Sequence, residues 1–413
     1  MSSFLQTTIG VVILSTALNI QAEVAAASRG VGSARVATAP NSVLTVNSIA
    51  DTSDGVCDAA NCTLREAIGA AQDGDIISFS TMFNTPQTIL LQTALPNISQ
   101  NITIQGTGAN LLTVRRNPNA ATNFRVFTTA GGFTVSVEIN AMTISGGQVN
   151  AGEVGGGISA STQFSLSNVH VNGNSAGSGG GVYMGFASGS FSNCTFSNNT
   201  SINVDGSGGG IFFLPNGGNN LRVINSTISG NTATTAGGIS VFSNSGSNTL
   251  EIINSTIANN SAGSVGAVRA FAQTNSTAAT TFRNSIVAGN VPINLASTTN
   301  VGGTATFQSL GFNLSDNYNG VVVLQVTDLT ANPLLGALQF NGGQTPTQAP
   351  SLGSLALDKG NASGTLTDQR GFSRPFDLPG IVSAAGGDGS DIGALEAQSL
   401  PLSELIFANG LEN

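Results

Sequence analysis

The sequence predicts an all-β fold, a single-stranded right-handed parallel β-helix with an N-terminal capping helix. Three observations support this prediction: a repeated asparagine pair, an alternation of apolar residues that changes phase within each repeat, and glycine-rich turns. The pairs are Asn168 with Asn174, Asn193 with Asn199, Asn225 with Asn231, Asn254 with Asn260, and Asn284 with Asn290. Successive first asparagines are 25, 32, 29 and 30 residues apart, a period typical of solenoids.

The apolar alternation predicts a chain corner at each first asparagine. The residue two positions before it and the residue three positions after it are both apolar, as in Val223 and Ile228 around Asn225. Strand side chains alternate with period two, so these positions cannot share a face of one straight strand. The first asparagines are therefore predicted to lie at corners and to hydrogen-bond from coil to coil as an inward ladder of Asn168, Asn193, Asn225, Asn254 and Asn284.

The other positions of the repeat follow from this corner. The residue after the asparagine is predicted to point inward, and the next residue is predicted to point outward as His170, Thr195, Thr227, Thr256 and Ile286. Glycines such as Gly210 and Gly238 suit turns that need positive φ. A right-handed coil is expected because strand–crossover–strand connections strongly favour that hand.

Composition agrees with a solenoid, which grows in one dimension and needs no division of 413 residues into globular domains. Apolar residues make up 40% of the chain and charged residues only 8%, with a formal net charge of −9. Nucleic acids and anionic membrane surfaces attract basic patches, so this balance argues against both as partners.

The first 22 residues are predicted to be a secretory signal peptide, although no Lys or Arg precedes their apolar run. Residues 23–42 are interpreted as a flexible leader. The protein is therefore expected to be secreted or displayed on a bacterial cell surface, without a transmembrane span in the mature chain. The tail, residues 397–413, has no recognised anchoring motif.

The most specific stretch lies in the predicted N-terminal cap, residues 43–80. It contains Cys57 and the run Cys62-Thr-Leu-Arg-Glu-Ala-Ile68, in which Thr63 and Glu66 form a capping box for a helix with one apolar stripe. Such a helix can cover the open end of a solenoid. This run resembles the CSLREA domain, an N-terminal module of bacterial secreted right-handed β-helix proteins of the pectin-lyase-like fold. Export together with this resemblance implies a disulfide between Cys57 and Cys62.

The repeats are assigned to residues 81–330, and the sequence pattern changes after them. Residues 331–396 contain Ala356-Leu-Asp-Lys-Gly360, Asp368-Gln-Arg-Gly-Phe-Ser-Arg-Pro375 and Asp391-Ile-Gly-Ala-Leu-Glu396 in that order. This trio resembles the choice-of-anchor Q domain, a C-terminal module of bacterial surface and secreted β-helix proteins. The resemblance implies a role outside the cell, at its surface or after secretion.

No catalytic constellation emerges from the residues. Hydrolysis of a polysaccharide needs paired carboxylates, and residues 142–290 contain only Glu153, Asp205 and Glu251 as acids. A lyase needs a base, for which His170 and Arg222 are weak candidates. His170 is interpreted as an outward-facing surface residue without a catalytic role, and Arg222 as the partner of Glu251 in an outward ion pair between neighbouring coils.

Metal binding has equally little support. Asp51, Asp54 and Asp58 are weak Ca²⁺ candidates, but their spacing fits no complete Ca²⁺ loop. No cofactor is expected. The sequence therefore favours a structural or adhesive role in which Thr, Ser and Asn on the lateral faces bind extracellular glycans or cell-envelope material. An extracellular polysaccharide lyase or hydrolase is the alternative.

Overall fold

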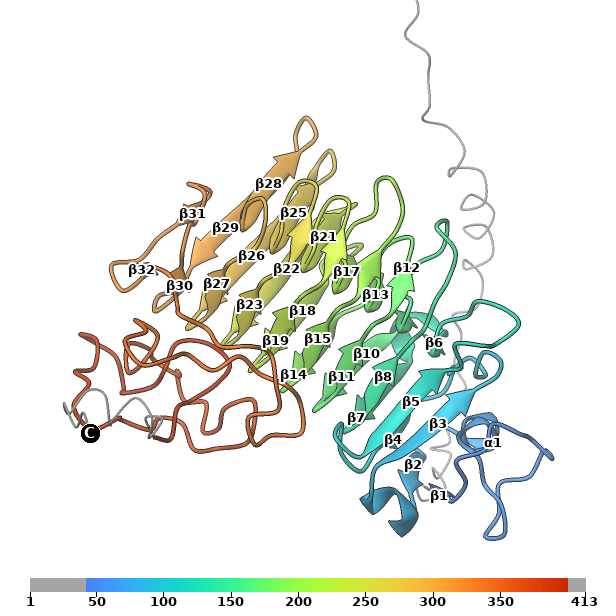
Figure 1. Cartoon of the computed structure of the whole chain (residues 1–413). Coiled ribbons are helices and arrows are strands. Elements are labelled where there is room, and N and C mark those ends of the chain that lie inside the picture. The colour runs from blue at the N-terminus through green and yellow to red at the C-terminus, as the bar shows by residue number, and fades with distance from the viewer. Residues whose placement is uncertain (1–41, 400–413) are drawn as a thin grey trace, which may run out of the picture. The chain divides into compact units, whose positions relative to one another are not determined.

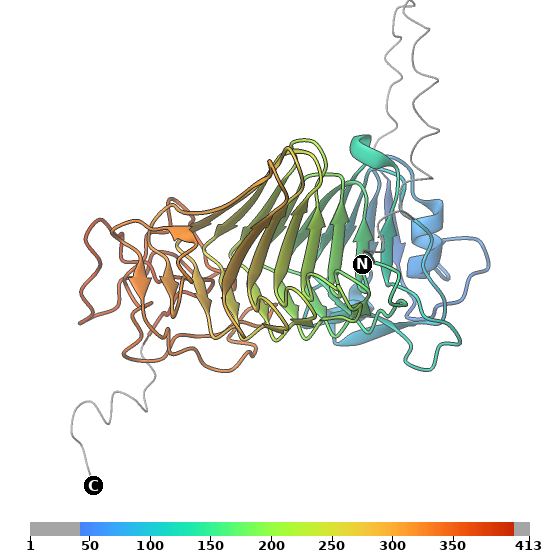
Figure 2. The same ribbon diagram turned by 90° about the horizontal axis from the view of Figure 1, so that it is seen from above.

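The computed structural model describes residues 42–399. The predicted signal peptide, nearly all of the predicted leader and most of the predicted tail lie outside this range. Within it the chain forms a stack of coils built from parallel strands (Figure 1). Seen from above, the strands follow one another along a single row (Figure 2). The prediction of an all-β parallel β-helix is confirmed.

Two long sheets run along the stack. Sheet A has 11 strands: β1 (Val43–Val46), β2 (Ile76–Phe79), β4 (Ile102–Gln105), β7 (Ser136–Asn140), β10 (Gln163–Ser167), β14 (Gly189–Ser192), β18 (Asn220–Ile224), β22 (Gly246–Ile253), β26 (Ser276–Arg283), β29 (Thr304–Ser309) and β31 (Val322–Val323). Sheet B has 10 strands: β3 (Gln87–Leu91), β5 (Leu112–Arg116), β8 (Thr143–Ser145), β11 (His170–Asn172), β15 (Thr195–Ser197), β19 (Thr227–Ser229), β23 (Thr256–Ala258), β27 (Ile286–Ala288), β30 (Leu314–Ser315) and β32 (Leu329–Thr330).

Two further sheets complete the coils. Sheet C has seven strands: β6 (Phe127–Thr129), β9 (Ile158–Ala160), β13 (Val182–Gly185), β17 (Ile211–Leu214), β21 (Ile239–Ser243), β25 (Val268–Ala272) and β28 (Leu295–Thr299). Sheet D has four strands: β12 (Ser175–Ala176), β16 (Thr200–Ser201), β20 (Thr232–Ala233) and β24 (Ser261–Ala262). The described helices are α1 (Leu64–Ala70) and the short 3-10 helices η1 (Thr81–Asn84) and η2 (Gly132–Thr134).

The first asparagine of each repeat occupies the corner between sheets A and B. Its φ is positive in all five copies, from +46° to +55°, a conformation that Asn tolerates better than most residues. The apolar residues on both sides of the corner face the core, and both Val223 and Ile228 are fully buried. The phase change in the sequence is therefore a physical corner, as predicted.

The continuous inward ladder, however, runs along the second asparagine of each pair, which corrects the sequence-based assignment. The side-chain amides bond in the series Asn174 to Asn199, Asn199 to Asn231, Asn231 to Asn260, Asn260 to Asn290 and Asn290 to Asn294, with N–O distances of 2.8–3.0 Å. Each oxygen from Asn199 to Asn290 also accepts the backbone N–H of the preceding asparagine. These side chains are buried because the turn places them inside the coil.

Among the first asparagines, one side-chain bond joins neighbouring coils, from Asn284 Nδ2 to Asn254 Oδ1. Asn168 and Asn193 are half-buried, and Asn225 donates instead to the carbonyl oxygen of Thr367 in the C-terminal segment. Because the backbone at the corner is left-handed, the side chain of the first asparagine points toward the segment that covers the outside of the corner. The ladder predicted for Asn168, Asn193, Asn225, Asn254 and Asn284 is wrong as a continuous column.

The glycine prediction also needs a correction. Positive φ occurs at Gly208 (+66°) but not at Gly210 or Gly238. A Cβ at Gly210 would lie 2.9 Å from the carbonyl oxygen of Gly238 in the next coil and 3.2 Å from the side chain of Asn231. Gly210 is therefore required by the close approach of the next coil and of the asparagine ladder, and not by its own backbone angle.

Helix α1 covers the first coil, at the blue end of the stack in Figure 2. Leu64, Ala67, Ile68 and Ala71 are at most 3% exposed and belong to the main core. Thr63 accepts the backbone N–H of Glu66, and the Glu66 carboxylate accepts the backbone N–H of Thr63. Strand β1 precedes the helix yet already pairs with β2, so the predicted cap segment contributes the first strands of sheet A.

We expect Asn260→Leu to lower the free energy of unfolding by at least about 1–3 kcal/mol, because it leaves buried partners on two coils without hydrogen bonds. The partners are the N–H of Asn231, the carbonyl of Ile228 and the amide oxygen of Asn290. Asn220→Leu is the control, since Asn220 lies in a strand outside the ladder. Equal denaturation midpoints for the two variants would contradict the ladder.

We expect a chain that begins at Gly74 to keep its β-sheet circular dichroism and to self-associate. Removal of β1 and α1 exposes apolar core and the backbone edge of β2, both of which favour association with another copy. Light scattering after size exclusion, compared with a chain beginning at Ser42, measures the outcome. A monomer that melts like the longer chain would show that this end needs no cover.

Candidate functional site

The weak catalytic candidates do not come together. His170 lies on β11 of sheet B, between Thr143 and Thr195 of the neighbouring coils. Its Nε2 lies 2.8 Å from Ser197 Oγ, and burial lowers the pKa of the imidazole to about 4. Arg222 lies on β18 of sheet A, where its Nε donates to Glu251 Oε2 at 2.9 Å. The predicted outward ion pair is present, and no His–Arg pair forms.

The Ca²⁺ candidates are engaged by separate protein partners. Asp51 pairs with Arg65 at 2.7 Å, and the side chain of Asp51 is 3% exposed. Asp58 accepts the backbone N–H groups of Asn61 and Ala60, which lower its pKa. Asp54 accepts the N–H of Val56. Among residues 42–399 no three His, Cys, Asp or Glu side chains gather as a metal site would require.

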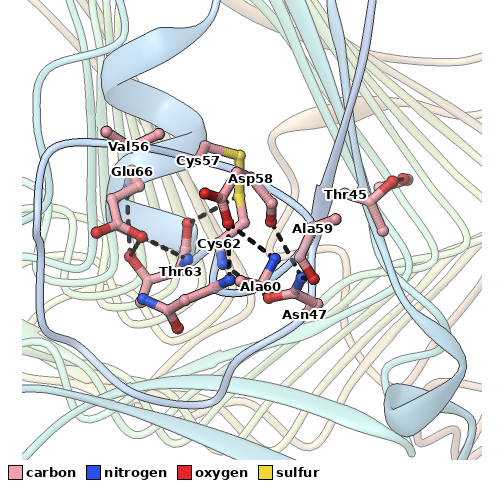
Figure 3. Close-up of a disulfide and its surroundings, with 12 residues drawn as sticks. Thr45, Asn47, Val56, Cys57, Asp58, Ala59, Ala60, Cys62, Thr63 and Glu66 are labelled. Atoms are coloured by element: carbon pink, nitrogen blue, oxygen red, sulfur yellow. Dashed lines mark hydrogen bonds between the residues drawn. A yellow bond between two sulfur atoms is a disulfide. The ribbon is translucent and has the colours of Figure 1, made fainter.

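A disulfide joins Cys57 to Cys62 at the N-terminal end of the stack (Figure 3). The bridge closes the loop that carries Asp58, and Asn47 ties this loop to the end of β1 by donating to the carbonyls of Asp58 and Ala59. A depression of about 460 Å³ lies between this loop and β1. Its only charged lining residue is Asp58, whose carboxylate is already hydrogen-bonded, so the depression offers little chemistry.

Cys194 is the free cysteine of the described chain. It is fully buried at the corner after Asn193, and burial raises the pKa of its thiol to about 12. A thiol in this state has no access to a substrate and behaves as a small apolar side chain.

The C-terminal segment, residues 331–396, lies against the outer face of sheet B (Figure 1). The outward threonines bond to it: Thr195 donates to the carbonyl of Pro346, Thr227 donates to Gln369, and Thr256 accepts the N–H of Ala394. These three side chains are at most 1% exposed. These threonines are therefore not available as part of the Thr-, Ser- and Asn-lined lateral faces predicted to bind glycans, because another part of the same chain covers them.

The three C-terminal motifs meet in one buried network. Arg374 donates to Glu396 at 2.8 Å, and both side chains are fully buried. Glu396 also accepts the N–H groups of Phe376 and Asp391, while Asp391 accepts those of Asp358 and Ala397. Burial, and then the neighbouring Glu396, raise the pKa of Asp391 to about 7. The hydrogen bonds and the ion pair of this network hold the segment together. Because solvent has no access to the network, it is not a reaction centre.

The outer face of sheet C carries a different surface. Ile211 and Phe213 of β17 are fully buried, so Phe212 between them points outward, and it is half-buried. Outward rings on four successive coils form what we call the aromatic stripe: Tyr183, Phe212, Phe242 and Phe271, with consecutive ring centroids 5.8, 6.4 and 4.5 Å apart. The Arg269 guanidinium lies 4.9 Å from the centroid of Phe271.

The sequence analysis missed this stripe. The signal was present, because an aromatic residue follows an apolar one in each of Val182-Tyr183, Ile211-Phe212, Val241-Phe242 and Ala270-Phe271. The strand register is needed to see that these rings stack along one face, since the repeats differ in length and the rings occupy two different positions in their strands.

Comparisons with known proteins add one structural likeness. No family model matches the chain, and no curated protein matches it, so the resemblances at its two ends have no family-model support. A solved structure described as pectate lyase Pel9A is 11% identical, with a TM-score of 0.44, over 87% of this chain and 97% of that chain. These values carry no information about activity, and the fold assignment rests on the strand pairing described above.

No helix within the described range is long and apolar enough to cross a membrane.

The buried acids predict a pH dependence. Folding raises the pKa of Asp391 from 3.8 to about 7, so the folded protein holds a proton that the unfolded chain releases. The contribution of Asp391 to the unfolding free energy is therefore full below about pH 4 and is lost as pH rises toward 7. His170, with its pKa lowered to about 4, acts in the opposite direction.

We therefore expect Asp391→Asn to gain stability relative to the parent as pH is raised from 4.5 to 8. Urea denaturation of both proteins across this range measures the difference, in which the His170 contribution cancels. A stability difference that does not change with pH would contradict a raised pKa at Asp391.

Proposed function

We propose that this protein is an exported, non-catalytic β-helix that binds glycan chains through the aromatic stripe on sheet C. The stripe is the observation that carries the proposal. It spans four strands of one sheet, about 14 Å at the usual strand spacing, which suits an extended chain lying along the stack. Sugar rings have C–H groups that make apolar contacts with aromatic side chains, and Phe212, Phe242 and Phe271 each keep part of their surface open to solvent.

The polar surroundings support a glycan over an apolar partner. Arg269 lies beside Phe271 and offers guanidinium donors to hydroxyl groups, and the exposed Thr298 is the register neighbour of Phe271 on the same face. An aromatic surface with polar donors at its margin provides both parts of sugar recognition, apolar contact and directed hydrogen bonds.

Three observations favour binding over catalysis. The weak candidates His170 and Arg222 lie on different sheets, and Arg222 is paired with Glu251. The buried carboxylates Asp391 and Glu396 serve the C-terminal network, where no substrate can reach them. None of these four side chains forms a solvent-accessible pair suited to proton transfer, which is why we favour binding over a polysaccharide lyase or hydrolase.

The two terminal resemblances also belong to this proposal. We propose that the N-terminal segment acts as a CSLREA-type cap, supported by the Thr63–Glu66 capping box and the Cys57–Cys62 bridge. The C-terminal segment would act as a choice-of-anchor Q-type module, supported by the convergence of its three motifs on Arg374, Asp391 and Glu396. Both fit a protein that works outside a bacterial cell, secreted or held at the surface.

We expect Phe271→Ala to weaken glycan binding by about tenfold or more, because truncation of an aromatic binding hot spot costs about 2 kcal/mol or more. Calorimetric titration with the best binder from a panel of soluble polysaccharides measures it. Phe340→Ala is the matched control, since Phe340 is 52% exposed and lies in the C-terminal segment. Equal losses in both variants, or release of reducing ends or unsaturated sugars by the parent protein, would overturn the proposal.

A further inference from the structure

A cleft of about 320 Å³ lies where the C-terminal segment meets the corner of sheet A, on strands other than those of the aromatic stripe. Its lining includes Arg222, Ile224, Ile253, Arg283, Ser363 and Thr365. The first four come from the ends of β18, β22 and β26, and the last two come from the C-terminal segment. The corner asparagines hold this loop in place, because Asn254 Nδ2 donates to Thr365 Oγ1 and Asn284 Oδ1 accepts the N–H of Asn361.

Two guanidinium groups converge on this cleft in a chain with only 12 Lys and Arg residues and a net charge of −9. Arg222 uses its Nε for Glu251, and Arg283 uses Nη1 for Ser363 Oγ at 2.9 Å. Both terminal nitrogens of Arg222, and Nη2 of Arg283, make no hydrogen bond to any residue within 42–399. Their N–H donors are therefore available to an anion.

The rest of the lining restricts the class of anion. Ile224 and Ile253 are half-buried neighbours in the register and form an apolar wall. Ser363 and Thr365 add hydroxyl groups on the opposite side. A volume of about 320 Å³ lies at the lower end of the range for small-molecule pockets. An apolar wall, two guanidinium groups and hydroxyl groups match a single ring that carries both a carboxylate and hydroxyls.

We propose that this cleft binds a carboxylate-bearing sugar residue, with the carboxylate between Arg222 and Arg283 and the ring against Ile224 and Ile253. Guanidinium groups bind carboxylates through paired, charge-assisted hydrogen bonds. The site is independent of the aromatic stripe, so it stands or falls separately from the proposed function.

Two acids oppose an anion here. Glu251 holds Arg222 by its Nε, and Asp388 accepts the N–H of Ala362 beside the cleft. The lining itself carries two arginines and no acid, and the two acids beside it bring the formal charge of these four groups to zero. Binding is therefore expected to be moderate and to weaken as salt rises, because the Arg222–Glu251 pair is exposed to solvent.

The test is calorimetric titration of the whole protein with glucuronate, galacturonate and N-acetylneuraminate, and with glucose as the neutral counterpart. We expect the acidic sugars to bind and glucose to bind at least about tenfold more weakly. Differences in affinity among the three acidic sugars show which sugar ring fits best against the apolar wall. If none of the acids binds more tightly than glucose, the proposal is overturned.

Variants separate recognition from structural damage. Arg283→Gln and Arg222→Gln are each expected to weaken binding of the acidic sugar about tenfold. Arg125→Gln is the matched control, because Arg125 pairs with Glu153 outside the cleft. Glu251→Gln is expected to tighten binding several-fold by releasing Nε of Arg222, a gain that a damaged protein would not show. Unchanged affinity in both cleft arginine variants, or weaker binding in Glu251→Gln, would contradict the proposal.

Discussion

The structure depends on a column of buried asparagine side chains that bond from coil to coil. Each amide from Asn199 to Asn260 accepts a backbone N–H, donates to a carbonyl of the preceding coil and donates to the next asparagine. The backbone groups at these turns are buried away from water, and an amide left without a hydrogen-bond partner there would cost about 1–3 kcal/mol. The column provides hydrogen-bond partners for the backbone of the turn, and it also fixes the register of neighbouring coils. Its need for space also explains why glycines such as Gly210 lie beside it.

The C-terminal segment supplies cover and hydrogen-bond partners for side chains on the outside of the coils. The outward threonines of sheet B would otherwise be solvated, but the segment buries them and supplies partners for Thr195 and Thr227. Arg374 and Glu396, both fully buried, would be costly as an isolated pair. Glu396 accepts two backbone N–H groups in addition to the guanidinium, and Arg374 donates to the carbonyl of Gly393, so much of that cost is offset. The motifs of this segment are thus used for attachment to the solenoid.

Because one face is covered, the two proposed binding sites lie on surfaces that remain. Phe212, Phe242 and Phe271 of sheet C and the arginines at the corner of sheet A remain partly exposed, whereas Tyr183 is only 7% exposed. The two surfaces differ in chemistry: the first offers apolar surface along three coils, and the second offers positive charge in a small cleft. The cleft exists only because the loop that carries Ser363 and Thr365 crosses the corner. The corner asparagines, directed outward by their left-handed backbone, attach that loop. A residue type chosen for its backbone angle therefore also helps to build a surface.

The sequence by itself determined the repeat, the corners, the buried apolar positions and the capping helix, because these follow from local periodicity and from side chains close along the chain. Val223, Ile228 and the stripe of Leu64 and Ile68 lie where the pattern places them. The sequence did not determine which asparagine of each pair forms the ladder, since the parity argument locates the corner but not the direction of each side chain. Only the tertiary structure decided that the C-terminal segment covers the threonines, that Tyr183, Phe212, Phe242 and Phe271 align, and that Arg222 and Arg283 share a cleft. Each of these arrangements joins residues from different coils or from segments more than 80 residues apart, and unequal coil lengths hide their register until the chain is stacked.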